Sequence, residues 1–66
     1  MIFDVLAISD EGDDERLLTQ CFRYGDALRY ARSVESSWAG FHILVVRNHD
    51  YPLCWIVDGQ IVKFAA

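Results

Sequence analysis

The segment "LCWIVDGQIVKF" (residues 53–64) decides the fold of this chain of 66 residues. Asp58 and Gly59 separate two apolar runs, and an Asp-Gly pair in that position is typical of a two-residue type I′ β-hairpin. The turn sets the register, in which Trp55 faces Val62 across the hairpin. The chain is therefore predicted to end in two antiparallel strands.

Three further segments have the composition of strands: residues 2–9, 16–23 and 41–48. Between segments 16–23 and 41–48 the spacing of apolar residues changes to that of a helix. Apolar residues at positions 27, 31, 34 and 38 form one stripe of a helix between Gly25 and Gly40. The predicted order is ββαβββ. This is an α+β fold with a mostly antiparallel sheet and one helix packed on one face, in a single domain of residues 1–66.

The ends of the predicted helix also follow from residue types. Asp26 is a suitable N-cap, although Gly25 or an earlier residue can hold that position. Gly40 is suited to the left-handed conformation that ends a helix. Residues 49–52, "HDYP", are predicted to form the turn before the final hairpin.

Both faces of the predicted sheet carry apolar side chains, although only one helix is present to cover them. The hairpin face with Trp55 and Val62 is the better candidate for the core. An uncovered aliphatic side chain forgoes about 1.5–3 kcal/mol of burial, and exposed apolar patches mark interfaces. The alternative is that sheet twist, the acidic residues between positions 10 and 15, and the termini shield the second face. The residues of the hairpin predicted to bind a second chain there are Cys54, Ile56 and Ile61.

The stretch "SDEGDDER" (residues 9–16) places five carboxylates within six positions. It can be a solvated hairpin loop, a surface for a basic partner, or a loop that binds a divalent metal ion. An EF-hand needs Glu at loop position 12, and a loop that starts at Asp10 has Cys21 there, so that match fails. The predicted partner-binding carboxylates are Asp10, Glu11, Asp13, Asp14 and Glu15.

The bulk composition narrows the classes of function. A net charge of −4 gives no general attraction to nucleic acid, so no direct nucleic-acid binding is expected. The first residues lack the basic segment of a signal peptide, and no apolar run is long enough to span a membrane. A cytoplasmic protein with reduced Cys21 and Cys54 is expected.

No pattern indicates catalysis, a metal ion, a cofactor or a small-molecule substrate. His42 and His49 lack the HxxxH or CxxC framework of a zinc site, and no nucleophile or phosphate-binding motif is present. A chain this short also has little room for a substrate pocket. The arginines around the helix either pair with Asp26 or Glu35 in solvent or contact a phosphate or an acidic partner: Arg23, Arg29 and Arg32.

The segments "CFRYGDALRYARS", "GFHILVV" and "CWIVDGQIVKF" resemble the layout of small phage-borne α+β proteins of the anti-CRISPR kind. Antitoxins of the HicB type share the order hairpin, helix and further sheet. The first resemblance implies a stoichiometric inhibitor that binds a CRISPR effector protein through a charged surface, and it assigns no individual residue.

The function expected from the sequence is thus a non-catalytic protein-binding module. Its acidic loop would occlude a basic surface of the partner. The alternative is a structural or antitoxin-like module that forms a homodimer through the second sheet face.

Overall fold

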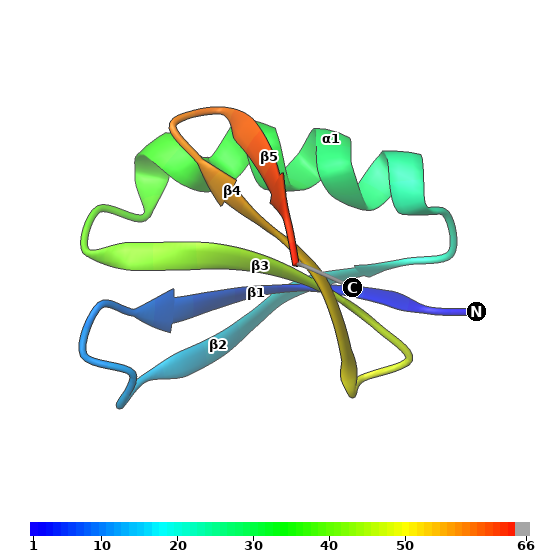
Figure 1. The fold of residues 1–66 in the computed structure, drawn as a ribbon, viewed down its shortest axis with the longest axis horizontal. Coiled ribbons are helices and arrows are strands. Elements are labelled where there is room, and N and C mark those ends of the chain that lie inside the picture. The colour runs from blue at the N-terminus through cyan, green and yellow to red at the C-terminus, as the bar shows by residue number, and fades with distance from the viewer. Residues whose placement is uncertain (65–66) are drawn as a thin grey trace.

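The computed structural model describes residues 1–64 and shows one sheet with a helix packed on it (Figure 1). The sheet order is β2-β1-β3-β4-β5, and every neighbouring pair is antiparallel. The predicted α+β class, the ββαβββ order and the helix on one face are confirmed. The elements are β1 (Phe3–Ser9), β2 (Glu15–Cys21), α1 (Tyr24–Val34), a 3-10 turn η1 (Glu35–Ser37), β3 (Phe41–Arg47), β4 (Tyr51–Val57) and β5 (Gln60–Lys63).

The helix is shorter than its apolar stripe predicts. It ends at Val34, and η1 follows, so Trp38 lies outside it and packs edge-on against Phe41 with 5.1 Å between ring centroids. Arg23 is the N-cap residue and makes no capping hydrogen bond through its side chain. Asp26 lies instead in the first turn, where the helix dipole favours a negative charge.

The final hairpin forms as the Asp-Gly pair predicts. Trp55 pairs with Val62, and Asp58 and Gly59 have φ values of 51° and 77°, the left-handed conformation that a type I′ turn requires at both positions. Gly40, with a φ of 83°, has the predicted left-handed conformation, but it does not end α1, whose C-cap residue is Glu35.

The turn between β3 and β4 differs from the prediction. Asn48 and His49 have φ values of 51° and 71°, and the N–H of Asp50 donates to the carbonyl oxygen of Arg47. The turn is therefore a second type I′ turn centred on residues 48 and 49. The segment 51–52, which was expected in the turn, belongs to β4.

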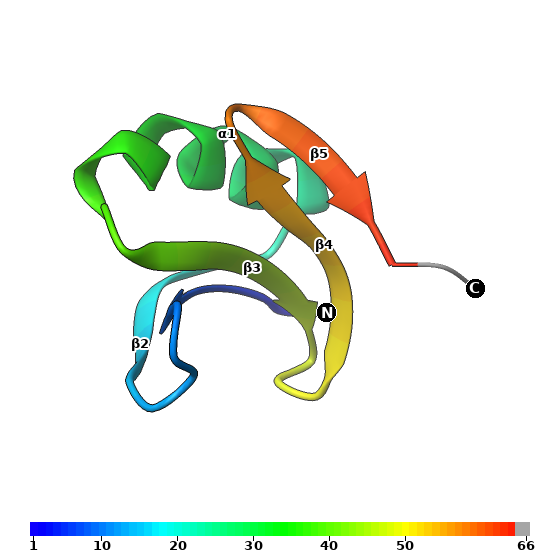
Figure 2. The same ribbon diagram turned by 60° about the vertical axis from the view of Figure 1, so that its left-hand side comes forward.

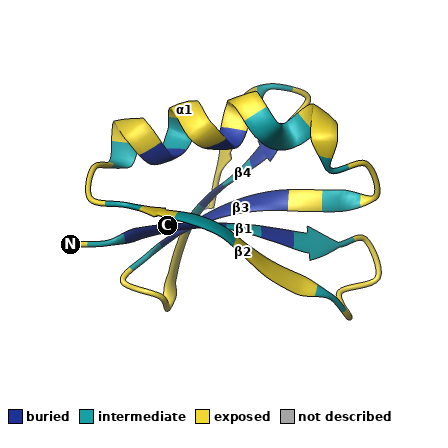
Figure 3. Cartoon of the chain, turned by 180° about the vertical axis from the view of Figure 1, so that it is seen from behind, coloured by how far each residue is buried: buried dark blue, intermediate teal, exposed yellow. Residues whose placement is uncertain are grey.

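The helix packs closely on the central strands through two fully buried alanines, Ala27 and Ala31 (Figure 3). It connects β2 to β3, which run parallel because both are antiparallel to β1 between them. About 98% of such crossovers are right-handed, so chain chirality helps to select the covered face. The buried sheet residues of the core are Phe3, Val5, Ala7, Ile43, Val45, Cys54 and Ile56.

The predicted assignment of the hairpin faces is wrong. Cys54 and Ile56 are buried in the core beneath α1, so they are not available to a partner, and Ile61 is 39% exposed beside the helix. Trp55 and Val62 lie on the opposite face. Alternate residues of the strands are apolar on both faces of the sheet, so hydrophobicity alone did not show which face the helix covers. On the covered face Ala7 and Cys54 are small side chains that leave room for the helix.

Replacing Ala31 by Leu is expected to lower the free energy of unfolding by about 1–3 kcal/mol, because the larger side chain has no space between α1 and the sheet. Urea unfolding followed by tryptophan fluorescence measures this. Ser33→Leu, at an exposed position of the same helix, is the matched control and should change stability by less than about 0.5 kcal/mol. Equal stability of the two variants would contradict close helix packing.

Candidate functional site

The face of the sheet turned away from α1 carries an apolar row that crosses all five strands. No helix within residues 1–64 covers this face (Figure 2). Each residue of the row is the register partner of the next, so the side chains lie side by side on one face. We call this row the open row, and its members in sheet order are Leu17, Leu6, Leu44, Trp55 and Val62.

Strong coiling of the sheet shields the centre of this face (Figure 2). Register shifts leave Leu18 as an extra residue in β2 and Leu53 as an extra residue in β4, and β-bulges of this kind increase strand twist. Leu44 on the central strand is consequently only 8% exposed. The ends of the open row stay accessible, with Leu17 55% and Val62 46% exposed.

The aromatic centre of the open row is Trp55, which is half-buried. Its ring lies 5.8 Å from the ring of His42 in an edge-on arrangement and 5.8 Å from the ring of Phe64. A half-buried tryptophan held between neighbouring rings is a preorganised contact residue, because little side-chain freedom remains to be lost on binding.

A buried carboxylate closes one end of the open face. Asp4 accepts a hydrogen bond from Gln20 Nε2 at 3.0 Å and lies 2.5 Å from His49 Nδ1. Asn48 adds a second tie, because its Oδ1 accepts the N–H of Ile2 at 3.1 Å and its own N–H donates to the Ile2 carbonyl at 2.7 Å. A buried carboxylate needs such partners, since an unpaired one is very costly. The β3–β4 turn is thereby fastened to β1.

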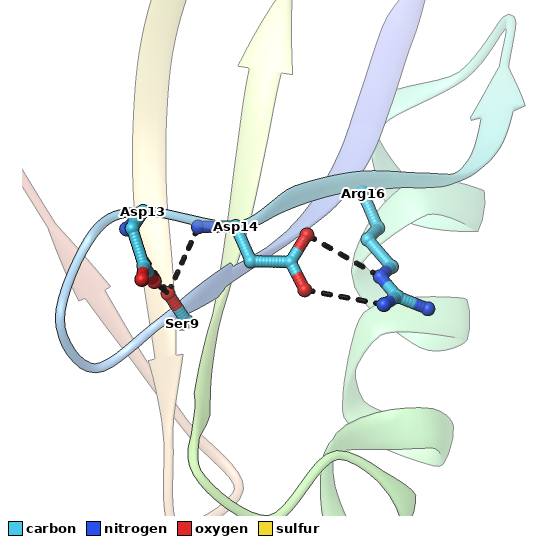
Figure 4. Close-up of polar contacts among 4 residues, drawn as sticks. All are labelled: Ser9, Asp13, Asp14 and Arg16. Atoms are coloured by element: carbon cyan, nitrogen blue, oxygen red, sulfur yellow. Dashed lines mark hydrogen bonds and ion pairs between the residues drawn. The ribbon is translucent and has the colours of Figure 1, made fainter.

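The acidic loop, residues 10–15, lies at the other end and is held by Ser9 (Figure 4). Ser9 Oγ donates to Asp13 Oδ1 at 2.8 Å and accepts the backbone N–H groups of Asp13 and Asp14 at 3.2 and 3.1 Å. Asp14 pairs with Arg16 at 3.2 Å. Two of the five carboxylates therefore serve the local structure of the loop.

Of the remaining carboxylates, Asp10 and Glu15 lie beside residues of the open face. Asp10 is 3.0 Å from His42 Nε2, and its backbone N–H donates to the Gly40 carbonyl at 2.9 Å. Glu15 is the register partner of Ile8 on the open face. Within residues 1–64, Glu11 and Glu15 make no ion pair, so the loop presents negative charge at the margin of the open row.

The other residues considered from the sequence are not brought together. His42 and His49 contact different carboxylates, and within residues 1–64 no three His, Cys, Asp or Glu side chains form a possible metal site. Arg29 pairs with Asp26 at 3.5 Å, as expected. The two cysteines are free thiols.

Glu35 has a role that the sequence did not reveal. The sequence indicated a surface ion pair between Glu35 and an arginine, and the structure shows a contact with backbone N–H groups instead. Its two carboxylate oxygens accept the backbone N–H groups of Asp58 and Gly59, each at 2.7 Å. This contact ties η1 to the β4–β5 turn and so positions the strand that carries Val62. The two groups are 23 and 24 residues apart in sequence, and no local pattern indicates such a contact.

Tyr24 connects the helix to the buried thiol of β4. Its hydroxyl lies 3.5 Å from Cys54 Sγ, and its ring is 5.6 Å from that of Phe3. Burial, followed by the hydrogen bond and charge interaction with Cys54, raises the pKa of Tyr24 from 10.0 to about 12. This contact belongs to the helix-covered side and is separate from the open face.

The sequence matches no family model, and neither a curated protein nor a solved structure is significantly similar to it. None of the helices within residues 1–64 has the length and apolar character needed to cross a membrane.

Replacing Glu35 by Gln is expected to lower the free energy of unfolding by about 1–2 kcal/mol. The amide provides one acceptor for two N–H groups, and hydrogen bonds to a charged group are the stronger ones. Thermal and urea unfolding measure the change. Glu15→Gln removes the same charge at an exposed site and is the matched control; an equal effect of both changes would exclude a special role for Glu35.

The raised pKa of Tyr24 predicts a late phenolate step in an alkaline titration of the three tyrosines. The stability that its neutral hydroxyl contributes is fully present below about pH 10 and is lost as the pH rises toward about 12. Ultraviolet absorbance of the phenolate follows the titration, and Tyr24→Phe should remove the late step. Tyr30→Phe is the control, and loss of the late step in that variant would contradict the assignment.

Proposed function

We propose that this protein is a non-catalytic binding module that docks another protein on its open face. The observation that supports this most directly is the open row, an apolar strip across five strands that no helix within residues 1–64 covers. Burying the exposed ends of the row, Leu17 and Val62, would stabilise a complex by roughly 1 kcal/mol or more for each side chain. Trp55 between them is the type of residue that dominates interface energetics.

Charge at the margin of the open face favours a partner with basic residues. Asp10 and Glu15 lie at one end of the open face, whereas its register positions within residues 1–64 carry no Lys or Arg. A second copy of this chain would therefore bring no cation from the same face to these carboxylates. A foreign protein with an apolar centre and basic residues beside it is complementary in both respects.

Basic protein surfaces of this kind commonly hold nucleic acid. The specific form of the proposal is therefore a stoichiometric inhibitor that acts in the cytoplasm and occludes the basic surface of a nucleic-acid-handling complex. The resemblance of the chain to small anti-CRISPR proteins suggests a CRISPR-type complex. The acidic loop supports this form, because Glu11 and Glu15 are exposed and have no ion-pair partner within residues 1–64.

The second candidate is a structural or antitoxin-like module that forms a homodimer through the same face. The open row is compatible with a homodimer, because its five residues are uncharged and the rows of two copies can pack against each other. Light scattering at low micromolar concentration distinguishes the two candidates. A monomer is expected for the inhibitor, and a dimer that dissociates on mutation of the open row would replace the proposal with the second candidate.

The test compares affinity capture by the wild-type protein with capture by a variant carrying Leu17→Ser and Val62→Ser. Proteins that wild type retains and the variant loses are identified by mass spectrometry, purified and measured by calorimetry. The double change should weaken binding at least about tenfold, since losing roughly 1 kcal/mol or more of apolar burial at each of two sites exceeds the ~1.4 kcal/mol of a tenfold change. Neutralising the five carboxylates should weaken binding and flatten its dependence on salt.

Phe22→Ser is the matched control, because Phe22 is 81% exposed and lies outside the open row. It should leave the affinity unchanged. Equal binding by wild type and the open-row variant would exclude the open face as the docking surface. Unchanged salt dependence after neutralisation would remove the acidic loop from the mechanism.

A further inference from the structure

The outer edge of β5 has backbone groups that no strand pairs. β5 is the last strand of the sheet, so only its β4 side is hydrogen bonded. Bonded and non-bonded pairs alternate along an antiparallel ladder, and the N–H of Phe64 donates toward β4, to the Leu53 carbonyl. The N–H and C=O groups of Ile61 and Lys63 consequently point away from β4. A free edge of this kind is a template for one more strand.

A groove of about 650 Å³ lies between this strand and α1. Its wall on the helix side contains Arg29, Arg32 and Ser33, and its wall on the strand side contains Gly59 and Ile61. The pair between Arg29 and Asp26 is long and exposed, and pairs of that kind are weak, so the guanidinium stays available to a ligand. Arg32 has no ion-pair partner within residues 1–64.

We infer that the β5 edge and this groove together bind an extended acidic segment of another protein, which adds to the sheet as a sixth strand. Main-chain hydrogen bonds to Ile61 and Lys63 would hold the segment. Side chains alternate across a strand, so every second residue of the segment would point toward the helix side. Carboxylates at these positions would meet Arg29 and Arg32, while the intervening side chains would lie beside Val62.

A second copy of this chain is a poor occupant of the edge. Lys63 is the register partner of Cys54, so its side chain projects on the helix side of the sheet. Pairing of two β5 strands would bring the Lys63 side chain of one copy toward Arg29 and Arg32 of the other, and like charges in contact oppose binding. The charge of the groove thus selects an acidic foreign segment.

This surface adjoins the open face at Val62, but the two differ in position and in charge. It lies on the helix side of the sheet and is basic, whereas the open face has an acidic margin. The two surfaces can therefore bind two parts of one partner, whereas two separate partners would meet at Val62. Failure of either proposal would leave the other standing, because the variants that test them do not overlap.

The experiment titrates ¹⁵N-labelled protein with a blocked peptide in which Val alternates with Glu. The amide signals of Ile61 and Lys63 should shift and gain protection from hydrogen exchange. A matched peptide with Lys in place of Glu should bind at least about tenfold more weakly. This comparison is stringent, because the net charge of −4 would favour the Lys peptide if attraction were only general.

Two pairs of variants test the contacts. Arg29→Gln combined with Arg32→Gln should weaken binding of the Glu peptide about tenfold, whereas Arg23→Gln, which removes an exposed arginine outside the groove, should not. Lys63→Pro removes an outward N–H without removing a bond to β4 and should abolish binding, whereas Lys63→Gln retains it. Thermal unfolding confirms that each variant is folded.

Several results would overturn the inference. The first two are equal affinity for the Glu and Lys peptides and protection of β2 amides in place of those of β5. The other two are wild-type affinity in folded Lys63→Pro and no binding of the Glu peptide at a concentration of about 1 mM.

Discussion

The structure depends on the close packing of α1 against one face of the sheet. Ala27 and Ala31 are completely buried, so the helix lies near the central strands and seals Val5, Val45 and their neighbours from water. The chain within residues 1–64 has no second helix for the other face. An apolar row is consequently left accessible at both ends, and this is the physical basis of the proposed binding function.

Coiling of the sheet limits how much of that row is exposed. The bulges at Leu18 and Leu53 increase the twist, and Leu44 and Val46 at the centre become nearly inaccessible without any covering element. Twist thus shields the centre of the face, whereas Leu17 and Val62 at the ends of the row stay exposed. The proposed contact surface is therefore the outer part of the row together with Trp55.

Long-range hydrogen bonds hold the curved sheet at its ends. Glu35 binds the β4–β5 turn, and Asp4 binds His49 in the β3–β4 turn. Both contacts join a carboxylate to a turn with left-handed residues, so they fix the hairpins that carry the open row and the β5 edge. A preorganised surface loses less conformational freedom on binding, which favours affinity from a small area.

The sequence by itself determined what local physics controls. The Asp58-Gly59 turn, the strands, the helix and their order follow from turn chemistry and periodicity, and so does the exposure of the acidic residues 10–15. Tertiary structure alone decided which face the helix covers, because both phases of β4 are apolar and neither phase by itself marks the core. It therefore moved Cys54 and Ile56 from the predicted interface into the core, and it formed the contacts of Glu35 and Asp4, which join residues far apart in the chain.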